Sequence, residues 1–204
     1  MKKKILMITV AALLIILSIA GTSMAYFTDT DEKTNTFTAG KVDITLNYAN
    51  DLDAIQKVYP SQNFDIDATI TVAADSEPAY VGAIITLEKA GGISTIITDD
   101  GAGDTAAISE LLVGLTTSGY TVKYVPTTDG YKVYVLNTAV VAANGTAKIF
   151  TDLKIPNDWG EAEVAVFADM SLTVKAYAVQ SAGFEGSDAA TAMEAAFTDW
   201  ADFN

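Results

Sequence analysis

Apolar and polar side chains alternate along most of this chain. The clearest run extends from Phe64 to Val72, where every second residue is apolar and all of the others are Asp or Thr. A period of two is typical of a β-strand with one face on a core and the other in water. The same pattern predicts strands at Val42–Leu46, Val81–Leu87, Ala147–Leu153 and, as one long strand, Glu163–Val179.

Turn signals divide these strands at short intervals. Tyr120–Val125 and Tyr131–Leu136 flank Asp129-Gly130 and are predicted to form a hairpin, and Asn144-Gly145 marks a further turn. Short antiparallel strands at such spacing favour an all-β fold, a β-sandwich of the jelly-roll or Greek-key kind. Its expected core comprises Phe64, Ile66, Ile70, Val72, Val81, Ile85, Leu87 and Leu172.

Two stretches depart from the alternation and predict short helices. Residues 105–113 follow Asp104 as a candidate N-cap and precede Gly114. Residues 188–201 follow Ser187 and place Met193, Phe197 and Trp200 on one side. We expect the second helix to be an amphipathic cap over one end of the sandwich, with a partner-binding helix as the alternative.

The first 25 residues have the layout of a cleaved secretory signal peptide. Lys2–Lys4 precede the apolar stretch Ile5–Ala20, and small residues then lead to a cleavage site between Ala25 and Tyr26. An uncleaved membrane anchor is the alternative, but a spanning helix needs roughly 20 apolar residues, which is longer than this stretch. The expected organisation is a signal peptide over 1–25, an extended arm over 26–40 and a sandwich domain over 41–204, secreted and without a stable membrane anchor.

Composition restricts partners and chemistry. Removing Lys2–Lys4 from the 12 basic residues leaves nine against 26 acidic ones, a formal charge of −17 with no arginine. Such a surface repels nucleic acid and anionic lipid. The absence of Cys excludes disulfides, and the absence of both His and Cys removes Ser-His-Asp and Cys-His catalysis and the usual zinc or copper ligands. Paired-carboxylate glycosidase chemistry is compatible with the composition, but carboxylates on solvated strand faces explain the same residues.

One acidic loop is a candidate calcium-binding site. Asp99, Asp100 and Asp104 lie among glycines in "TDDGAGD". An EF-hand loop has acids at alternate positions and a glutamate at its twelfth, which this loop lacks. We therefore interpret it as a solvated turn and expect neither a metal nor a cofactor.

Several segments resemble one known family. "AYFTDTDEKTNTFTAGKVDITL" after the signal sequence, "SEPAYVGAIITLE", "DGYKVYVLNTAVVAANGTAKIFTDLKIP" and "DMSLTVKAYAVQSAGF" are similar, in this order, to segments of the TasA/camelysin family. The resemblance implies a jelly-roll subunit of biofilm-matrix fibres in a Gram-positive bacterium, exported through the signal peptidase SipW. It implies other copies of the chain as partners and leaves a companion matrix subunit open.

In such fibres an N-terminal segment of one subunit completes the sheet of the next. Here the corresponding arm is Tyr26–Phe37, with Gly40 as a candidate hinge. An extended peptide can satisfy the unpaired backbone groups of an exposed sheet edge. The residues suited to a donor strand are Tyr26, Phe27, Thr34, Thr36 and Phe37. The alternative is that the arm is an edge strand of its own domain, or a frayed terminus.

The resemblance also leaves two other functions open. Camelysin-like members are described as metalloendopeptidases, although this chain has no HExxH motif and no histidine. A monomeric secreted adhesin or binding module is the other alternative. We expect that the protein is not an enzyme.

Overall fold

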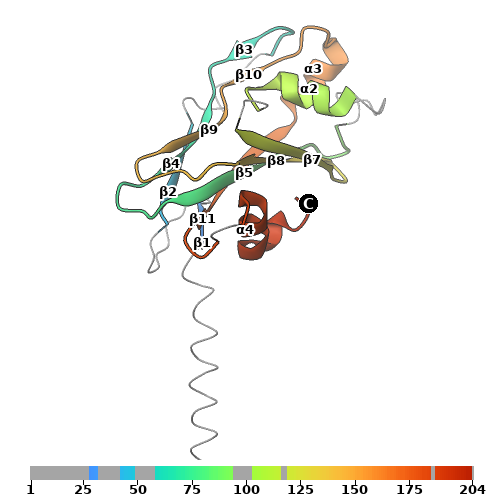
Figure 1. Cartoon of the computed structure of the whole chain (residues 1–204). Helices are drawn as coiled ribbons and strands as arrows, with labels where there is room; N and C mark the ends of the chain where they lie inside the picture. The colour runs from blue at the N-terminus through green and yellow to red at the C-terminus, as the bar shows by residue number, and fades with distance from the viewer. Residues whose placement is uncertain are drawn as a thin grey trace, which may run out of the picture.

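Antiparallel strands make up most of the fold in the computed structural model, which describes residues 28–31, 42–48, 58–93, 103–115, 119–184 and 187–203 (Figure 1). The strands form one five-stranded and two three-stranded sheets, and helices within the described ranges are short. The all-β class and the sandwich predicted from the alternation are confirmed.

The five-stranded sheet has the order β1-β11-β5-β8-β7, with β1 and β7 at its edges. Its strands are β1 (Thr28–Asp31), β5 (Ala79–Glu88), β7 (Tyr120–Pro126), β8 (Gly130–Asn137) and β11 (Ser171–Gln180). β7 and β8 form the predicted hairpin, with Tyr120 opposite Asn137 and Pro126 opposite Tyr131.

The two smaller sheets have the orders β2-β4-β9 and β3-β10-β6. Their strands are β2 (Ile44–Tyr48), β3 (Asn63–Phe64), β4 (Ala68–Val72), β6 (Leu112–Val113), β9 (Thr146–Phe150) and β10 (Asp152–Lys154). The predicted Asn144-Gly145 turn precedes β9, and Asn144 takes the left-handed conformation with φ 59°.

The main core lies between the five-stranded sheet and the smaller sheets. Alternate residues of β5 and β11 face alternate residues of β4 and β9 there. Six of the eight predicted core residues are buried, whereas Phe64 and Leu172 are half-buried and pack against the core.

Phe64–Val72 is not one strand. Phe64 ends β3, whereas β4 begins at Ala68 in a different sheet. Phe64, Ile66 and Ala68 nevertheless keep the predicted inward face. Ala147–Leu153 divides in the same way, because Thr151 separates β9 from β10. Alternation predicts which face is buried, but it does not reveal where a chain passes from one sheet to another.

The prediction of one long strand over Glu163–Val179 is wrong in its first part. Residues Glu161–Ala168 form helix α3, and β11 follows. The carboxylate of Glu163 accepts a hydrogen bond from the backbone N–H of Gly160 at 2.9 Å, which supports the first turn of the helix. Glutamate and alanine favour helix, and the alternation of Val164 and Val166 hid this preference.

Both predicted helices exist with different bounds. α2 covers Gly103–Leu111, so Asp104 lies inside it instead of capping it, and residues 112 and 113 form β6. α4 covers Ala189–Ala196, and a 3₁₀ turn, η3, follows at Thr198–Trp200. The N-cap is Asp188, not Ser187, because the Asp188 side chain accepts from the N–H of Thr191 at 2.8 Å.

The C-terminal segment, residues 187–203, forms a third layer. It packs on the outer face of the five-stranded sheet, not over one end of the sandwich as predicted (Figure 1). A second core lies between them, formed by Ile84, Tyr134, Leu136, Tyr177 and Val179 of the sheet and Ala189, Ala192, Met193, Trp200 and Phe203 of the segment.

Candidate functional site

The sheet edge at β11 is the candidate site, because an N-terminal strand pairs there. β1 has four residues, and Thr28 lies opposite Val179 and Asp31 opposite Ala176. β11 has ten residues, and its other side pairs with β5 along its whole length. Within the described ranges, no strand pairs with the β1 side of residues 171–175.

The hydrogen-bonding parity of β11 follows from its ladder with β5. The N–H of Ser181 donates to the carbonyl oxygen of Pro78 at 3.0 Å, in the register that pairs Gln180 with Ala79. Because bonded pairs alternate in an antiparallel ladder, odd-numbered residues of β11 bond to β5. Even-numbered residues therefore direct their N–H and C=O groups toward the edge that β1 occupies.

The two ends of β11 have different neighbours. At its Gln180 end, β5 begins at Ala79, and residues 73–78 lead there from β4. Asp43 lies at the same end, because its carbonyl oxygen accepts from the N–H of Ala73 at 2.8 Å. At its Ser171 end, β11 follows α3 and pairs with Glu88. The chain therefore enters β2 at the Gln180 end.

All of the predicted site residues lie outside the described residues. The segment that is described, β1, belongs to the predicted arm and pairs with β11 of its own chain. The predictions that stay untested are the cleavage between Ala25 and Tyr26, the hinge Gly40, and the donor residues Tyr26, Phe27, Thr34, Thr36 and Phe37.

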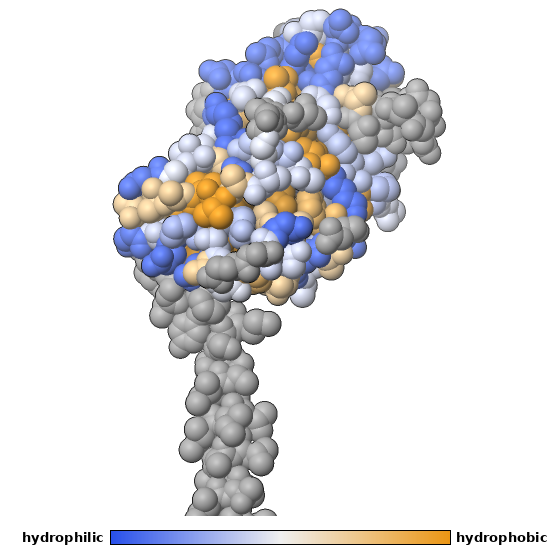
Figure 2. All heavy atoms as spheres, viewed as in Figure 1, coloured by the Kyte–Doolittle hydropathy of each residue, from blue (hydrophilic) through white to orange (hydrophobic). Residues whose placement is uncertain are grey.

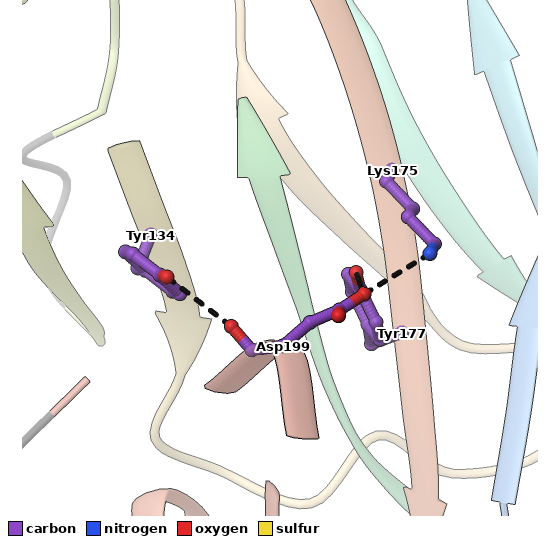
Figure 3. A network of polar contacts seen from close by, with 4 residues as sticks. All are labelled: Tyr134, Lys175, Tyr177 and Asp199. Atoms are coloured by element: carbon purple, nitrogen blue, oxygen red, sulfur yellow. Dashed lines mark hydrogen bonds and ion pairs between the residues drawn. The ribbon is translucent and has the colours of Figure 1, made fainter. Parts of the chain in front are cut away.

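The outer face of β11 supports the C-terminal segment through Asp199 (Figure 3). The Tyr177 hydroxyl donates to Oδ2 of Asp199 at 2.6 Å, and the Lys175 ammonium donates to the same oxygen at 3.1 Å. The Tyr134 hydroxyl donates to the backbone carbonyl oxygen of Asp199 at 3.1 Å. This network connects η3 to two strands of the five-stranded sheet.

The network favours the charged form of the carboxylate. Hydrogen bonds from Tyr177 and then Lys175 hold the pKa of Asp199 below its ordinary value of 3.8. Burial raises the pKa of Tyr134, and the negative charges of Asp202 and Asp199 raise it further. Asp199 is half exposed, so solvent screens its ion pair with Lys175.

Sequence reasoning missed this network. Lys175 and Tyr177 are two residues apart on a predicted strand and therefore share a face, which was a usable signal. Nothing in the pattern indicated that Asp199 would lie above them, because it belongs to a turn more than 20 residues away in sequence.

The acidic residues do not form a metal centre in the described part of the chain, where no group of three or more His, Cys, Asp or Glu side chains could hold an ion. Asp99 and Asp100 of the candidate calcium loop lie outside the described residues, and Asp104 lies in α2. No helix within the described ranges is long and apolar enough to cross a membrane.

Comparison with known families gives one match. Residues 1–71, which include β1, β2 and most of β4, match the family model described as camelysin metallo-endopeptidase. Over this part of the chain, the match confirms the resemblance to the TasA/camelysin family. No curated protein and no solved structure matches the chain.

Proposed function

We propose that this chain, whose first 71 residues match the camelysin family, is the structural subunit of extracellular biofilm-matrix fibres. In each fibre the N-terminal arm of one copy pairs with β11 of the next. The protein is secreted, and SipW removes residues 1–25 during export. The observation that supports this assembly best is the short pairing of β1 with a strand more than twice its length.

The arm matches the length of β11. Extending the observed register places Phe27 opposite Gln180 and Thr36 opposite Ser171. The arm from Phe27 to Thr36 could therefore pair with all ten residues of β11. Removal of the signal peptide after Ala25 would place the new N-terminus one residue before this ladder begins.

A chain cannot make this full ladder with itself. A ladder from Phe27 to Thr36 would be about 30 Å long at the rise of an antiparallel strand. It would end at the Ser171 end of β11, but Val42 must return to the Gln180 end, near Asp43 and Ala73. The six residue steps from Thr36 to Val42 reach about 22 Å at most.

Pairing with a neighbouring copy removes this limit. The body of the donor then lies beyond the Ser171 end of the acceptor, so the chain need not return. Exchange replaces a short ladder with a longer one and leaves each copy with an acceptor edge for the next arm. Such a head-to-tail contact is heterologous and propagates instead of closing.

The metalloendopeptidase alternative takes its support from the name of the family model. A catalytic zinc is held by His, Cys and carboxylate side chains, usually with at least one His. This chain has no His and no Cys. Its residues do not fit such a centre, so the structural role is the better proposal. A monomeric adhesin or binding module has no specific observation in its favour.

Electron microscopy and light scattering of the chain from Tyr26 to Asn204 test the proposal. We expect fibres from this protein and monomers from a variant that starts at Ala39. The variant should fold, because within the described ranges the buried core begins at Val42. Circular dichroism and a cooperative thermal transition are the controls for folding. Fibres from the shortened variant would overturn arm exchange, and persistent monomers of the complete mature chain would favour the binding module.

A further inference from the structure

An apolar surface lies at the Gln180 end of the sandwich. Its apolar part comprises Ala139, Val140 and Ala142 of the β8–β9 connection and Ala74 and Pro78 of the β4–β5 connection, all of them exposed. Asp75 and Glu77 of the β4–β5 connection are exposed as well, so the surface also carries two carboxylates. We call this surface the apolar tip. Val140 is 43% exposed, and Tyr59 is the other large hydrophobic side chain that is exposed in the described part of the chain. Figure 2 shows orange and cream atoms at this end, on the left of the view, with blue atoms on either side of them.

Backbone hydrogen bonds fix the shape of the apolar tip. The N–H of Ala79 donates to the carbonyl oxygen of Val141 at 2.9 Å, and the N–H of Val141 donates back at 2.8 Å. The N–H of Gly145 donates to Ala142 at 2.8 Å. A Cβ at position 145 would lie 2.7 Å from that same carbonyl oxygen, so this turn requires glycine. A preformed surface loses little conformational entropy when it docks.

A second apolar surface lies at the Ser171 end, on helix α3. Ala162, Ala165 and Ala168 of this helix are exposed, and its charged side chains are Glu161 and Glu163 in the first turn. A surface helix ordinarily carries polar residues on its outer side. Beyond its first turn the exposed residues of α3 are instead alanines, which leave the backbone accessible to close packing, and the exposed Asp169 follows as its C-cap.

We infer that the apolar tip of one copy packs against α3 of the next copy in the fibre. This inference rests on the proposed arm exchange, because exchange brings these two ends together. In the exchanged register, Thr36 of the donor lies opposite Ser171 of the acceptor, three residues after Ala168. Val42 of the donor lies within about 22 Å of Thr36 of the same copy. Asp43 and Ala73 are hydrogen-bonded beside it, so the donor presents the end that carries its apolar tip.

The small size of the apolar tip favours a partner that is already tethered, such as α3 of the next copy. A few exposed alanines, a proline and one valine offer much less area than a stable free-standing interface buries. A contact of this size contributes when another link holds the partners together, because tethering makes the second contact intramolecular. The arm ladder is such a link. The body contact then fixes the orientation of successive subunits.

Charge substitutions at Val140 test the contact and its partner surface. Val140→Asp would add a carboxylate to those of Asp75 and Glu77 and bring it near Glu161 and Glu163 of the next copy, so we expect the critical concentration for fibre formation to rise about tenfold. Val140→Lys brings a charge of the opposite sign toward the same glutamates, so its effect should be clearly smaller. Ala201→Asp is the matched control, since it adds the same charge to an exposed alanine on the C-terminal segment. This control should assemble like the unmodified chain.

Suppression by a second substitution identifies α3 as the contact surface. Ala165→Lys, combined with Val140→Asp in the same chain, should lower the critical concentration again toward that of the unmodified protein. Equal critical concentrations for Val140→Asp, Val140→Lys and Ala201→Asp would overturn the inference. If Val140→Asp impairs assembly without suppression by Ala165→Lys, the apolar tip contacts a surface other than α3, and the inference as stated is wrong.

A peptide experiment separates this inference from the proposed function. A labelled peptide of residues 26–37 should bind to Val140→Asp protein that lacks its own arm as tightly as to the same arm-deleted protein with Val140. Normal peptide binding with impaired fibre growth supports a body contact in addition to the arm. If the peptide binds neither protein, arm exchange itself fails. If the peptide binds both proteins and Val140→Asp fibres grow normally, the inference of a contact between the apolar tip and α3 is wrong, and arm exchange still stands.

Discussion

The indole ring of Trp200 lies in the space that a side chain at Gly82 would need. A Cβ built on Gly82 would be 2.6 Å from Cη2 of Trp200 and 3.0 Å from the carbonyl oxygen of Val135. Gly82 thus makes a recess in the outer face of β5, and the edge of Trp200 fills it. Tyr134 and Tyr177 surround the same indole, with ring centroids 5.5 and 5.7 Å away.

We therefore expect Gly82→Ala to loosen the C-terminal segment. The added methyl group forces the indole outward, which should cost roughly 1–3 kcal/mol of unfolding free energy. Denaturant unfolding measures the loss, and a red shift of tryptophan fluorescence reports the displaced ring. The main core should persist, since it lies on the other face of β5.

The double variant Gly82→Ala, Trp200→Phe tests the cause. The smaller Phe ring leaves room for the methyl group, so the two substitutions together should cost less than the sum of their separate effects. Strict additivity would show that Gly82 matters for another reason, such as strand pairing with Val135.

Acid should weaken the attachment of the C-terminal segment through Asp199. Because the pKa of Asp199 is lowered in the folded protein, its contribution to stability is present above the ordinary value of 3.8. It is lost as the pH falls through the lower folded value. Asp199→Asn should reduce the unfolding free energy by no more than about 1 kcal/mol at pH 7, because the side chain is half exposed.

The difference between Asp199→Asn and the unmodified protein should shrink as the pH falls below 3.8. Denaturant unfolding at several pH values measures this change. Asp202→Asn is the matched control, an exposed carboxylate three residues further on. A constant difference between pH 7 and pH 2 would contradict the role of the Asp199 carboxylate.

Proline substitutions should distinguish the arm residues whose N–H groups face β11 from those whose N–H groups point away from it. In the extended register, Lys33 and Asn35 have the parity of Asp29 and Asp31, whose N–H groups face β11. Proline at 33 or 35 removes a ladder donor, whereas proline at Thr34 or Thr36 removes an N–H that points away from β11. We expect Lys33→Pro and Asn35→Pro to slow fibre growth more, as measured by light scattering. Equal or reversed effects would contradict this register.

Proteolysis assays should find no metallopeptidase activity. Purified protein incubated with casein should release no more peptide than buffer does, with or without zinc, calcium or a chelator. The physical reason is the lack of His and Cys, which supply most ligands of catalytic zinc. Chelator-sensitive cleavage that co-purifies with the protein and disappears in carboxylate variants would contradict this expectation.

The alternation of side chains predicts faces better than connections. Ile66, Ile70 and Val72 are buried as expected, because their parity fixes the side of the chain that faces the core. The division of Phe64–Val72 between two sheets depends on long-range pairing, such as that of Phe64 with Leu153, which no local pattern contains.

The C-terminal segment shows the same limit. Its spacing of Met193, Phe197 and Trp200 predicted an apolar side, and Met193 and Trp200 are buried. Its docking surface could not be predicted, because the recess at Gly82 exists only when β5 and β8 are paired. A glycine within an apolar strand was the available signal, since such a residue often marks the close approach of another group.

If the chain is exported and assembled as proposed, the positions of β1 and β11 in the chain have a consequence for the order of pairing. Thr28 and Val179 are paired, yet about 150 residues separate them, so this contact forms late by the loop-closure argument. If the chain crosses the membrane from its N-terminus, β1 emerges first and β11 close to last. During that interval the arm has no partner in its own molecule, while a subunit that is already folded outside offers a finished β11. The order of emergence alone therefore gives the preceding molecule the first opportunity to bind the arm.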